Sequence, residues 1–207
     1  MIKSINTNPN LNACDLHLLP DIYNTLQLVG DVLEFGTFTG NSSIHLAQRM
    51  PEQKIYTIDH FLGLEQTNKT AVEYWYEGAF ALGRPEYANE NNVPKSVEEL
   101  KQKISPYKNL QLIESDIHKL NHPDSYGIGQ IGLVNIDVDI YEPTVSSLEF
   151  LTKCKWERIF IRFDDWHGDK PEYYEHERLA FAEWITKYKY QYQITHGGYI
   201  GGVVVSR

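Results

Sequence analysis

Apolar stretches that end in acidic or polar residues recur along the chain. Five of them have the length and composition of strands, and they cover 32–35, 54–59, 110–116, 131–139 and 158–166. Parallel strands that are buried on both faces are apolar almost throughout, and their carboxyl ends meet at one edge of a sheet. The pattern therefore predicts a mostly parallel sheet with acidic residues along one edge.

Helical patterns separate these stretches. Apolar spacing of three and four residues predicts helices at 20–27, 44–48, 96–104, 141–151 and 173–188. Pro20 suits a first turn, Ser96 is a cap candidate, and Asn41, Ser42 and Ser43 can cap the helix that follows them. Two closing strands are predicted at 190–195 and 199–205, with Gly201-Gly202 as a bend or bulge between them. The alternation predicts one doubly wound α/β domain over residues 1–207.

Residues 66–94 have no clear period and are rich in aromatic, Asn and Glu residues. Long irregular segments in compact domains are often functional, so we interpret this segment as an insertion or a lid that could recognise a substrate. For most of its aromatic residues, however, we favour the alternative that they pack the insertion onto the domain.

Composition narrows the possible partners. The chain has 207 residues, 42% of them hydrophobic, and a formal net charge of -9. This charge has the wrong sign for holding phosphate backbones, so nucleic acid is not expected as a partner. Cys14 and Cys154 lie far apart, as expected of two reduced thiols. Without an apolar leader or a stretch that could span a bilayer, we expect a soluble, cytoplasmic protein with no membrane contact.

A glycine-bearing turn, Glu34-Phe35-Gly36-Thr37-Phe38-Thr39-Gly40, follows the first strand. A dinucleotide fingerprint needs glycine at the third and sixth positions of this turn, where Phe38 and Asn41 stand, which argues against NAD or FAD. The order acid-x-Gly-x-x-x-Gly resembles the first motif of class I S-adenosylmethionine methyltransferases. In that family the acid contacts the methionine amine and the glycines line the cofactor. The resemblance implies a cofactor-binding set of Glu34, Phe35, Gly36, Thr37, Gly40 and Ser42. An ordinary strand-to-helix connection is the alternative.

The next strand end supports the same cofactor. Asp59 follows Gly36 at close to the interval of about 20 residues at which nucleotide-binding units place a carboxylate on the ribose. Asp59-His60-Phe61-Leu62-Gly63-Leu64 is similar to the second motif of the macrocin O-methyltransferase family, metal-dependent enzymes that methylate sugar hydroxyls. His60, adjacent to Asp59, is expected to lie against the adenosine, and the resemblance places Asp116 with Ile117 at the adenine ring. A solvated turn acid is the alternative for Asp116.

The fourth and fifth strand ends carry the closest resemblance. Asp137-x-Asp139-x-Tyr141-Glu142-Pro143-Thr144 matches the family's fourth-strand motif, and Asp164-Asp165 falls where the family places two metal-binding aspartates. If the extended geometry persists, Asp137 and Asp139 point to the same side. Asp137, Asp164 and Asp165 would then bind Mg²⁺ or another divalent cation, with Asp137 also near the cofactor. Solvated strand-end acids are the alternative.

The sequence gives a weaker indication of which residue is the general base. Related metal-dependent enzymes commonly have a histidine after the fourth-strand aspartate, but position 140 is Ile. We take His167 as the first candidate and Asp139 as the second, although a histidine at a loop can simply be a surface residue. Family members also usually carry Pro-Gly-Gly before the fifth strand, where Lys155-Trp156-Glu157 stands.

The resemblance implies a Rossmann-like methyltransferase fold, with a seven-stranded, mostly parallel sheet and an antiparallel last strand. It implies an O-methyltransferase that uses S-adenosylmethionine and a divalent metal on a small molecule, a sugar or a sugar-bearing compound. A non-catalytic cofactor-binding or partner protein of the same fold is one alternative, and N-methylation of an amino sugar is another. We also expect a homo-oligomer, because the N-terminal region is short relative to macrocin-type enzymes and aromatic residues are abundant.

Overall fold

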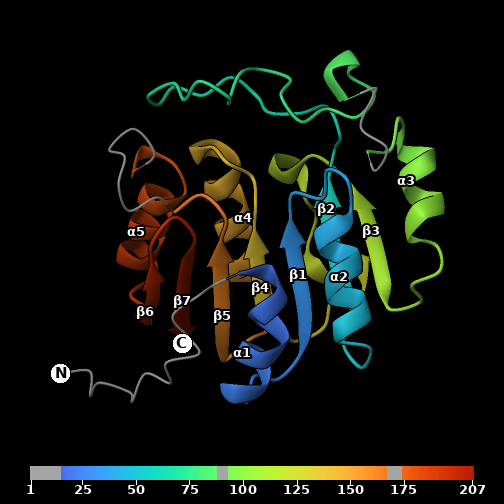
Figure 1. Cartoon of the computed structure of the whole chain (residues 1–207). Coiled ribbons are helices and arrows are strands. Elements are labelled where there is room, and N and C mark those ends of the chain that lie inside the picture. Colours follow the sequence, from blue (N-terminus) through green and yellow to red (C-terminus); the bar gives the residue numbers. More distant parts are fainter. Residues whose placement is uncertain (1–14, 88–92, 167–173) are drawn as a thin grey trace.

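The computed structural model describes residues 15–87, 93–166 and 174–207 (Figure 1). Its strands are β1 Asp31–Phe35, β2 Ile55–Asp59, β3 Leu110–Glu114, β4 Ile131–Ile136, β5 Arg158–Phe163, β6 Gln191–Gly197 and β7 Gly201–Ser206. Its α-helices are α1 Leu19–Thr25, α2 Asn41–Arg49, α3 Val97–Ile104, α4 Tyr141–Lys153 and α5 Glu177–Tyr188. Short 3-10 helices are η2 Leu16–Leu18, η3 Pro85–Tyr87, η4 Ile117–Lys119 and η5 Pro123–Tyr126. None of the described helices is long and apolar enough to cross a membrane.

The strands form one seven-stranded sheet in the order β3-β2-β1-β4-β5-β7-β6. Neighbouring strands from β3 through β5 pair in parallel, whereas β7 lies antiparallel between β5 and β6. The predicted doubly wound α/β fold with an antiparallel last strand is therefore confirmed.

Alternate residues of the strands face two separate cores. Leu33 and Phe35 of β1 pack with the buried residues of α4 and α5 on one face. Val32, the residue before Leu33, packs with the buried residues of α1 and α2 on the other. Figure 1 shows these helix pairs on opposite sides of the sheet. Because both faces are covered, the strands are apolar along most of their length, which is why the sequence predicts them well.

Three local predictions differ from the structure. Helix α2 has Gly40 at its N-cap with φ +73°, and no side chain caps it, so Asn41, Ser42 and Ser43 lie inside the first turn. Gly201 and Gly202 lie within β7 and pair with β5, so they make no bend between the closing strands, although the register of β6 against β7 shifts between Ile194 and His196, opposite Gly202. Glycine is needed at 201 for another reason, since a Cβ there would lie 2.6 Å from the indole of Trp166. The predicted helix at 173–188 begins at Glu177.

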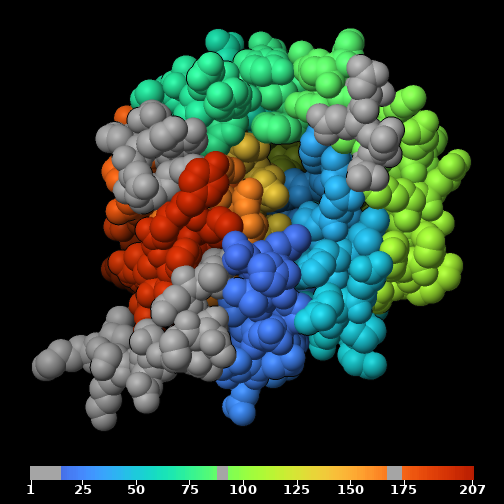
Figure 2. Space-filling model, viewed as in Figure 1, coloured from blue at the N-terminus to red at the C-terminus, as the bar shows by residue number. Residues whose placement is uncertain are grey.

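A long connection passes over the carboxyl ends of the parallel strands. Residues 60–87, which we call the crossing segment, run from the end of β2 to η3 above this edge of the sheet (Figure 1). Except for η3, they form turns and irregular backbone. Figure 2 shows the molecule hollowed beneath this segment, so the carboxyl edge of the sheet forms the floor of a cavity and the crossing segment forms its roof.

Candidate functional site

The cavity lies at the point where the strand order reverses. Strands β1 and β4 are neighbours in the sheet, and the connections that follow them lead to α2 and α4 on opposite faces. Open α/β sheets bind ligands at such switch points. The cavity has a volume of about 640 Å³, and its lining draws on the ends of β1, β2, β4 and β5, the turn after β3 and the crossing segment.

Gly36 fixes the distance between the two strand ends. Its backbone has φ +89°, and a Cβ at this position would lie 1.7 Å from the carbonyl oxygen of Asp137. The Asp137 amide donates to the carbonyl of Phe35 at 2.9 Å, which holds the strand ends together. The glycine is therefore required by the close approach of β4, independently of any ligand.

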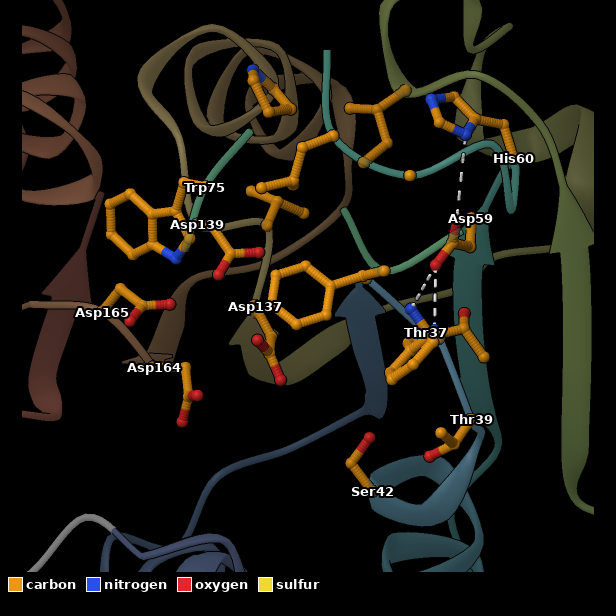
Figure 3. Close-up of a pocket in the computed structure, with 18 of the residues that line it drawn as sticks. Thr37, Thr39, Ser42, Asp59, His60, Trp75, Asp137, Asp139, Asp164 and Asp165 are labelled. Carbon is orange, nitrogen blue, oxygen red and sulfur yellow. Dashed lines mark hydrogen bonds and ion pairs between the residues drawn. The ribbon is translucent and has the colours of Figure 1, made fainter. Parts of the chain in front are cut away.

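Asp59 braces the glycine turn from the end of β2. One of its carboxylate oxygens accepts hydrogen bonds from the amides of Thr37 and Phe38, each at 2.9 Å (Figure 3). The other oxygen accepts from the amide of Phe61 at 2.7 Å. The carboxylate lines the cavity, and each oxygen has lone pairs beyond these bonds. Asp59 thus shapes the turn and remains available to a ligand hydroxyl.

Glu34 lies behind the cavity wall, not in it. It is fully buried and accepts hydrogen bonds from the hydroxyl groups of Ser43 and Thr57 and from the amide of Asn135 at 3.0 Å. Burial raises the pKa of Glu34, and the hydrogen bonds, that of Ser43 first, partly offset this effect. The contact with a methionine amine predicted for Glu34 finds no support in this placement, because the carboxylate is enclosed by β2, β4 and α2.

A row of polar side chains crosses the sheet beneath the cavity. Glu34 is in register with Thr57 on one side and with Asn135 on the other, and Asn135 is in register with Arg162. Arg162 donates to the Asn135 side-chain oxygen at 2.8 Å and to the carboxylate of Asp164. This row, which we call the polar ladder, connects the strand of the glycine turn to an aspartate of the acidic group described next.

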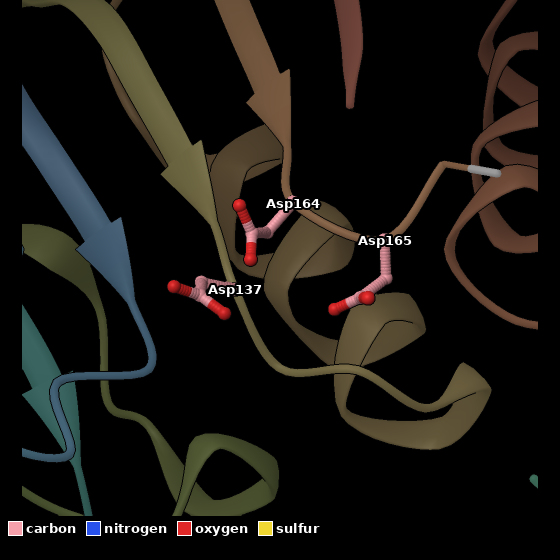
Figure 4. Close-up of side chains that lie close together, drawn as sticks. All are labelled: Asp137, Asp164 and Asp165. Carbon is pink, nitrogen blue, oxygen red and sulfur yellow. The ribbon is translucent and has the colours of Figure 1, made fainter. Parts of the chain in front are cut away.

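Asp137, Asp164 and Asp165 converge at the ends of β4 and β5 (Figure 4). One oxygen from each carboxylate lies within 4.8 Å of the other two. Burial raises the pKa of Asp137 well above its usual value, and the charges of Asp164 and Asp165 raise it further. Among the described residues, the guanidinium of Arg162 opposes this repulsion, and a divalent cation bound by the three carboxylates would relieve the rest.

Asp139 lies next to this group, but not on an extension of the strand. Strand β4 ends at Ile136, and Asp139 has a left-handed backbone with φ +60°, so the extended geometry assumed for residues 137–139 does not hold. The turn still brings Asp139 into the cavity, beside Asp165, with which it shares a hydrogen bond. Burial raises the pKa of Asp139 well above its usual value, and the Asp165 charge adds to the shift.

The crossing segment supplies an aromatic wall. Trp75 packs with Val72 and Ile140 and meets the buried ring of His176 edge-on, with centroids 5.0 Å apart. His176 is also within hydrogen-bond distance of the Thr70 carbonyl, at 3.0 Å from Nε2. The segment is therefore anchored to the residue that precedes α5, and Trp75 is held over the acidic group.

Two further contacts attach the crossing segment to the rest of the cavity. The ring of Phe38 in the glycine turn packs against Phe80 and Tyr87, at centroid distances of 5.6 Å and 5.2 Å. The ring of His118 lies 2.8 Å from the carboxylate of Glu65 and 2.7 Å from the hydroxyl of Ser146. The roof is thus tied to both the glycine turn and α4.

Most of the predicted site residues line the cavity. They are Gly36, Thr37, Ser42, Asp59, His60, Asp116, Ile117, Asp137, Asp139, Asp164 and Asp165. Glu34, Phe35 and Gly40 are described but do not belong to its lining. Asp116 accepts from the amide of His118 and from Lys119. His167 lies outside the described residues.

Several residues of the site escaped prediction. Asn135 and Arg162 interrupt apolar strands, and that interruption is a signal that each needs a buried polar partner. Glu65, Trp75 and Tyr199 also line the cavity. They belong to segments without periodicity or to a strand turn, so no sequence pattern marks them.

Comparison with known proteins identifies the fold. No family model matches the chain, and no curated protein matches it in sequence. The O-methyltransferase NovP superposes with a TM-score of 0.64 at 16% identity, over 93% of this chain and 78% of NovP. The calicheamicin methyltransferase CalS11 superposes with a TM-score of 0.63 at 21% identity, over 92% of this chain and 77% of CalS11.

A second structure of CalS11 is described as a TDP-rhamnose 3'-O-methyltransferase, with a TM-score of 0.54 at 19% identity over 92% of this chain and 78% of that one. An S-adenosylmethionine-dependent methyltransferase from Aquifex aeolicus gives a TM-score of 0.54 at 16% identity, over 94% of each chain. The chain therefore has the fold of S-adenosylmethionine-dependent methyltransferases, and its structural neighbours include O-methyltransferases, one of them described as acting on a sugar nucleotide.

Proposed function

We propose that this protein is an S-adenosylmethionine-dependent O-methyltransferase that uses a divalent cation and acts on a hydroxyl of a carbohydrate or carbohydrate-bearing small molecule. One observation carries the proposal. The glycine turn and the group Asp137, Asp164 and Asp165 face the same cavity across the β1–β4 switch point. A cofactor-type turn and a cation-type carboxylate group in one cavity are what metal-assisted methyl transfer requires.

The two halves of the cavity have different tasks. The glycine turn, Asp59, His60, Asp116 and Ile117 would hold S-adenosylmethionine, which supplies an electrophilic methyl group when bound. Asp137, Asp164 and Asp165 would hold Mg²⁺ or a similar cation, which lowers the pKa of a coordinated hydroxyl. The crossing segment covers the cavity. It would limit the access of water and help hold the acceptor hydroxyl in line with the methyl group.

Asp139 is the base that the described residues support. Transfer forms a bond from the acceptor oxygen to the methyl carbon, and the acceptor proton has to leave during attack. Asp139 lines the cavity next to Asp165 without belonging to the three-carboxylate group. Its raised pKa makes the carboxylate a better proton acceptor than an exposed aspartate. His167 stays a prediction, and its replacement by Gln should leave turnover largely intact if Asp139 is the base.

The acidic group provides the sharpest test. Replacing Asp164 with Asn removes one anionic ligand at nearly constant shape, so we expect Mg²⁺ affinity and turnover to fall at least tenfold. Binding of S-adenosylhomocysteine should be retained, because the glycine turn and Asp59 lie on other strand ends. Glu114→Gln is a matched control, since Glu114 ends β3 and pairs with Lys101 away from the cavity.

Three results would contradict the proposal. The first is a failure of calorimetry to detect S-adenosylhomocysteine binding to the folded wild-type protein, which would exclude the cofactor. Turnover that a chelator leaves unchanged would exclude the metal. Cofactor binding without turnover over a broad panel of hydroxylated acceptors would favour a non-catalytic binding protein.

A further inference from the structure

The acceptor side of the cavity is rich in carboxyl groups. Asp137, Asp139, Asp164 and Asp165 line it, and the buried carboxylate of Glu177 lies directly behind, accepting from the Asp165 amide at 3.0 Å. The cation of the proposed function would be held by Asp137, Asp164 and Asp165, so the carboxyl groups of Asp139 and Glu177 lie beyond that ligand set. Oxygen acceptors thus remain beside the cation, and a positive charge on the ligand would favour their ionised form.

Aromatic rings surround the same space. Figure 3 shows Trp75 beside Asp139 and Asp165, on the side of the cavity away from Asp59 and Thr37. Tyr74 and Tyr199 also line the cavity, and both are largely exposed, as expected of residues at its rim. Aromatic faces attract cations through the ring quadrupole and pack against sugar rings, and nearby carboxylates strengthen the attraction for an ammonium group.

A phosphate-bearing acceptor would find few partners here. Among the described residues that line the cavity, Arg162 is the one lysine or arginine. It is 5% exposed, and its guanidinium donates to Asn135 and Asp164. Phosphates are usually held by arginine or lysine side chains that reach the anion. The CalS11 acceptor is named as TDP-rhamnose, which carries a diphosphate, so this cavity differs in chemistry from what such an acceptor needs.

We propose that the acceptor is a carbohydrate that carries a protonated amine near the reacting hydroxyl, and not a nucleoside-diphosphate sugar. The ammonium group lies between Trp75 and the carboxylates of Asp139 and Asp165, while the hydroxyl faces the metal-binding group. This inference rests on the proposed function and specifies its substrate class. A positive charge on the ligand is favoured by three features of the described lining. These are its carboxyl groups, its aromatic rings and the absence of a lysine or arginine side chain that could reach an anion.

Matched pairs of sugars test the charge directly. The probes are the methyl glycosides of glucosamine, galactosamine and mannosamine, their N-acetyl derivatives, and UDP-glucose. Binding is measured by calorimetry with S-adenosylhomocysteine and Mg²⁺ present. For at least one sugar we expect the free amine to bind tenfold or more tightly than its N-acetyl partner, with the advantage shrinking as salt is added. UDP-glucose should bind more weakly than that amine.

Variants then locate the ammonium site. Trp75→Leu should lose most of the amine preference and Trp75→Phe should keep part of it. Because Trp75 is packed in the crossing segment, retained cofactor binding serves as the control for folding. Tyr199→Leu changes an exposed rim residue and should reduce amine binding without affecting the fold.

The possible outcomes separate this inference from the proposed function. If no free amine binds more tightly than its acetylated partner, or if UDP-glucose binds best, the acceptor class is wrong. If that happens while S-adenosylhomocysteine and Mg²⁺ still bind, the proposed function stands and only this inference falls. Transfer of the methyl group to nitrogen, seen by mass spectrometry of the product, would keep the acceptor class and overturn the O-transfer.

Discussion

Substituting Gly36 should be far more damaging than substituting a glycine of similar backbone conformation elsewhere. An Ala Cβ at position 36 would lie 1.7 Å from the carbonyl oxygen of Asp137 and 2.7 Å from its carbon. The obstacle is backbone inside a paired strand end, so it cannot rotate away as a side chain could. Gly127, with φ +72°, has no heavy atom of the described residues within 4 Å of the position of a Cβ. The two glycines therefore differ mainly in steric overlap.

The expected costs follow from this difference. A left-handed backbone costs a non-glycine residue about 1–2 kcal/mol, and both Ala variants incur it. Gly127→Ala should lose about that much. Gly36→Ala has to separate β1 from β4 as well, which places it among exceptional substitutions with losses above about 4 kcal/mol. Because Asp137 is the residue displaced, any folded Gly36→Ala protein should also bind Mg²⁺ more weakly.

Urea denaturation followed by circular dichroism measures both losses under identical conditions. A loss for Gly36→Ala within about 1 kcal/mol of that for Gly127→Ala would refute the argument, because it would mean that the β1–β4 approach adjusts at little cost. If Gly36→Ala fails to fold while Gly127→Ala folds, the loss exceeds the stability of the wild-type protein, which is the outcome that the steric argument predicts.

Three further predictions concern the polar ladder, a buried thiol and assembly. Asn135→Leu leaves Glu34 and Arg162 without their shared partner, so the free energy of unfolding should fall by about 3–5 kcal/mol, and a loss under 1 kcal/mol in urea would contradict the role of the ladder. Burial raises the pKa of the Cys154 thiol to about 12 from 9.0. The folded state then keeps a proton that the unfolded state releases, so stability should fall as pH rises through this range. Cys154→Ala should make that slope shallower, and Tyr141, whose pKa is also raised to about 12, should keep part of it. A homo-oligomer stays a prediction, and sedimentation that gives a monomer at micromolar concentration would count against it.

The sheet and the acidic group could be predicted because their signals are local. A strand buried on both faces has to be apolar, and an acid at its carboxyl end has to emerge at the functional edge of a parallel sheet. Asp137, Asp164 and Asp165 satisfy both conditions, and the structure brings them together. Asp139 shows the limit of the same reasoning, since its place in the cavity depends on a left-handed turn that alternation along a strand does not predict.

Glu34 shows what the sequence leaves open. An acid two residues before a glycine turn can face a ligand or face its neighbours in the sheet, and the register of adjacent strands decides between these possibilities. Here β1 aligns Glu34 with Thr57 and Asn135, and both side chains donate to its carboxylate. A buried carboxylate needs hydrogen-bond donors. Because Thr57 and Asn135 supply them from within the sheet, the Glu34 side chain is satisfied without facing the cavity. The single sequence shows that Glu34 needs partners, whereas only the register of the strands shows that the sheet provides them.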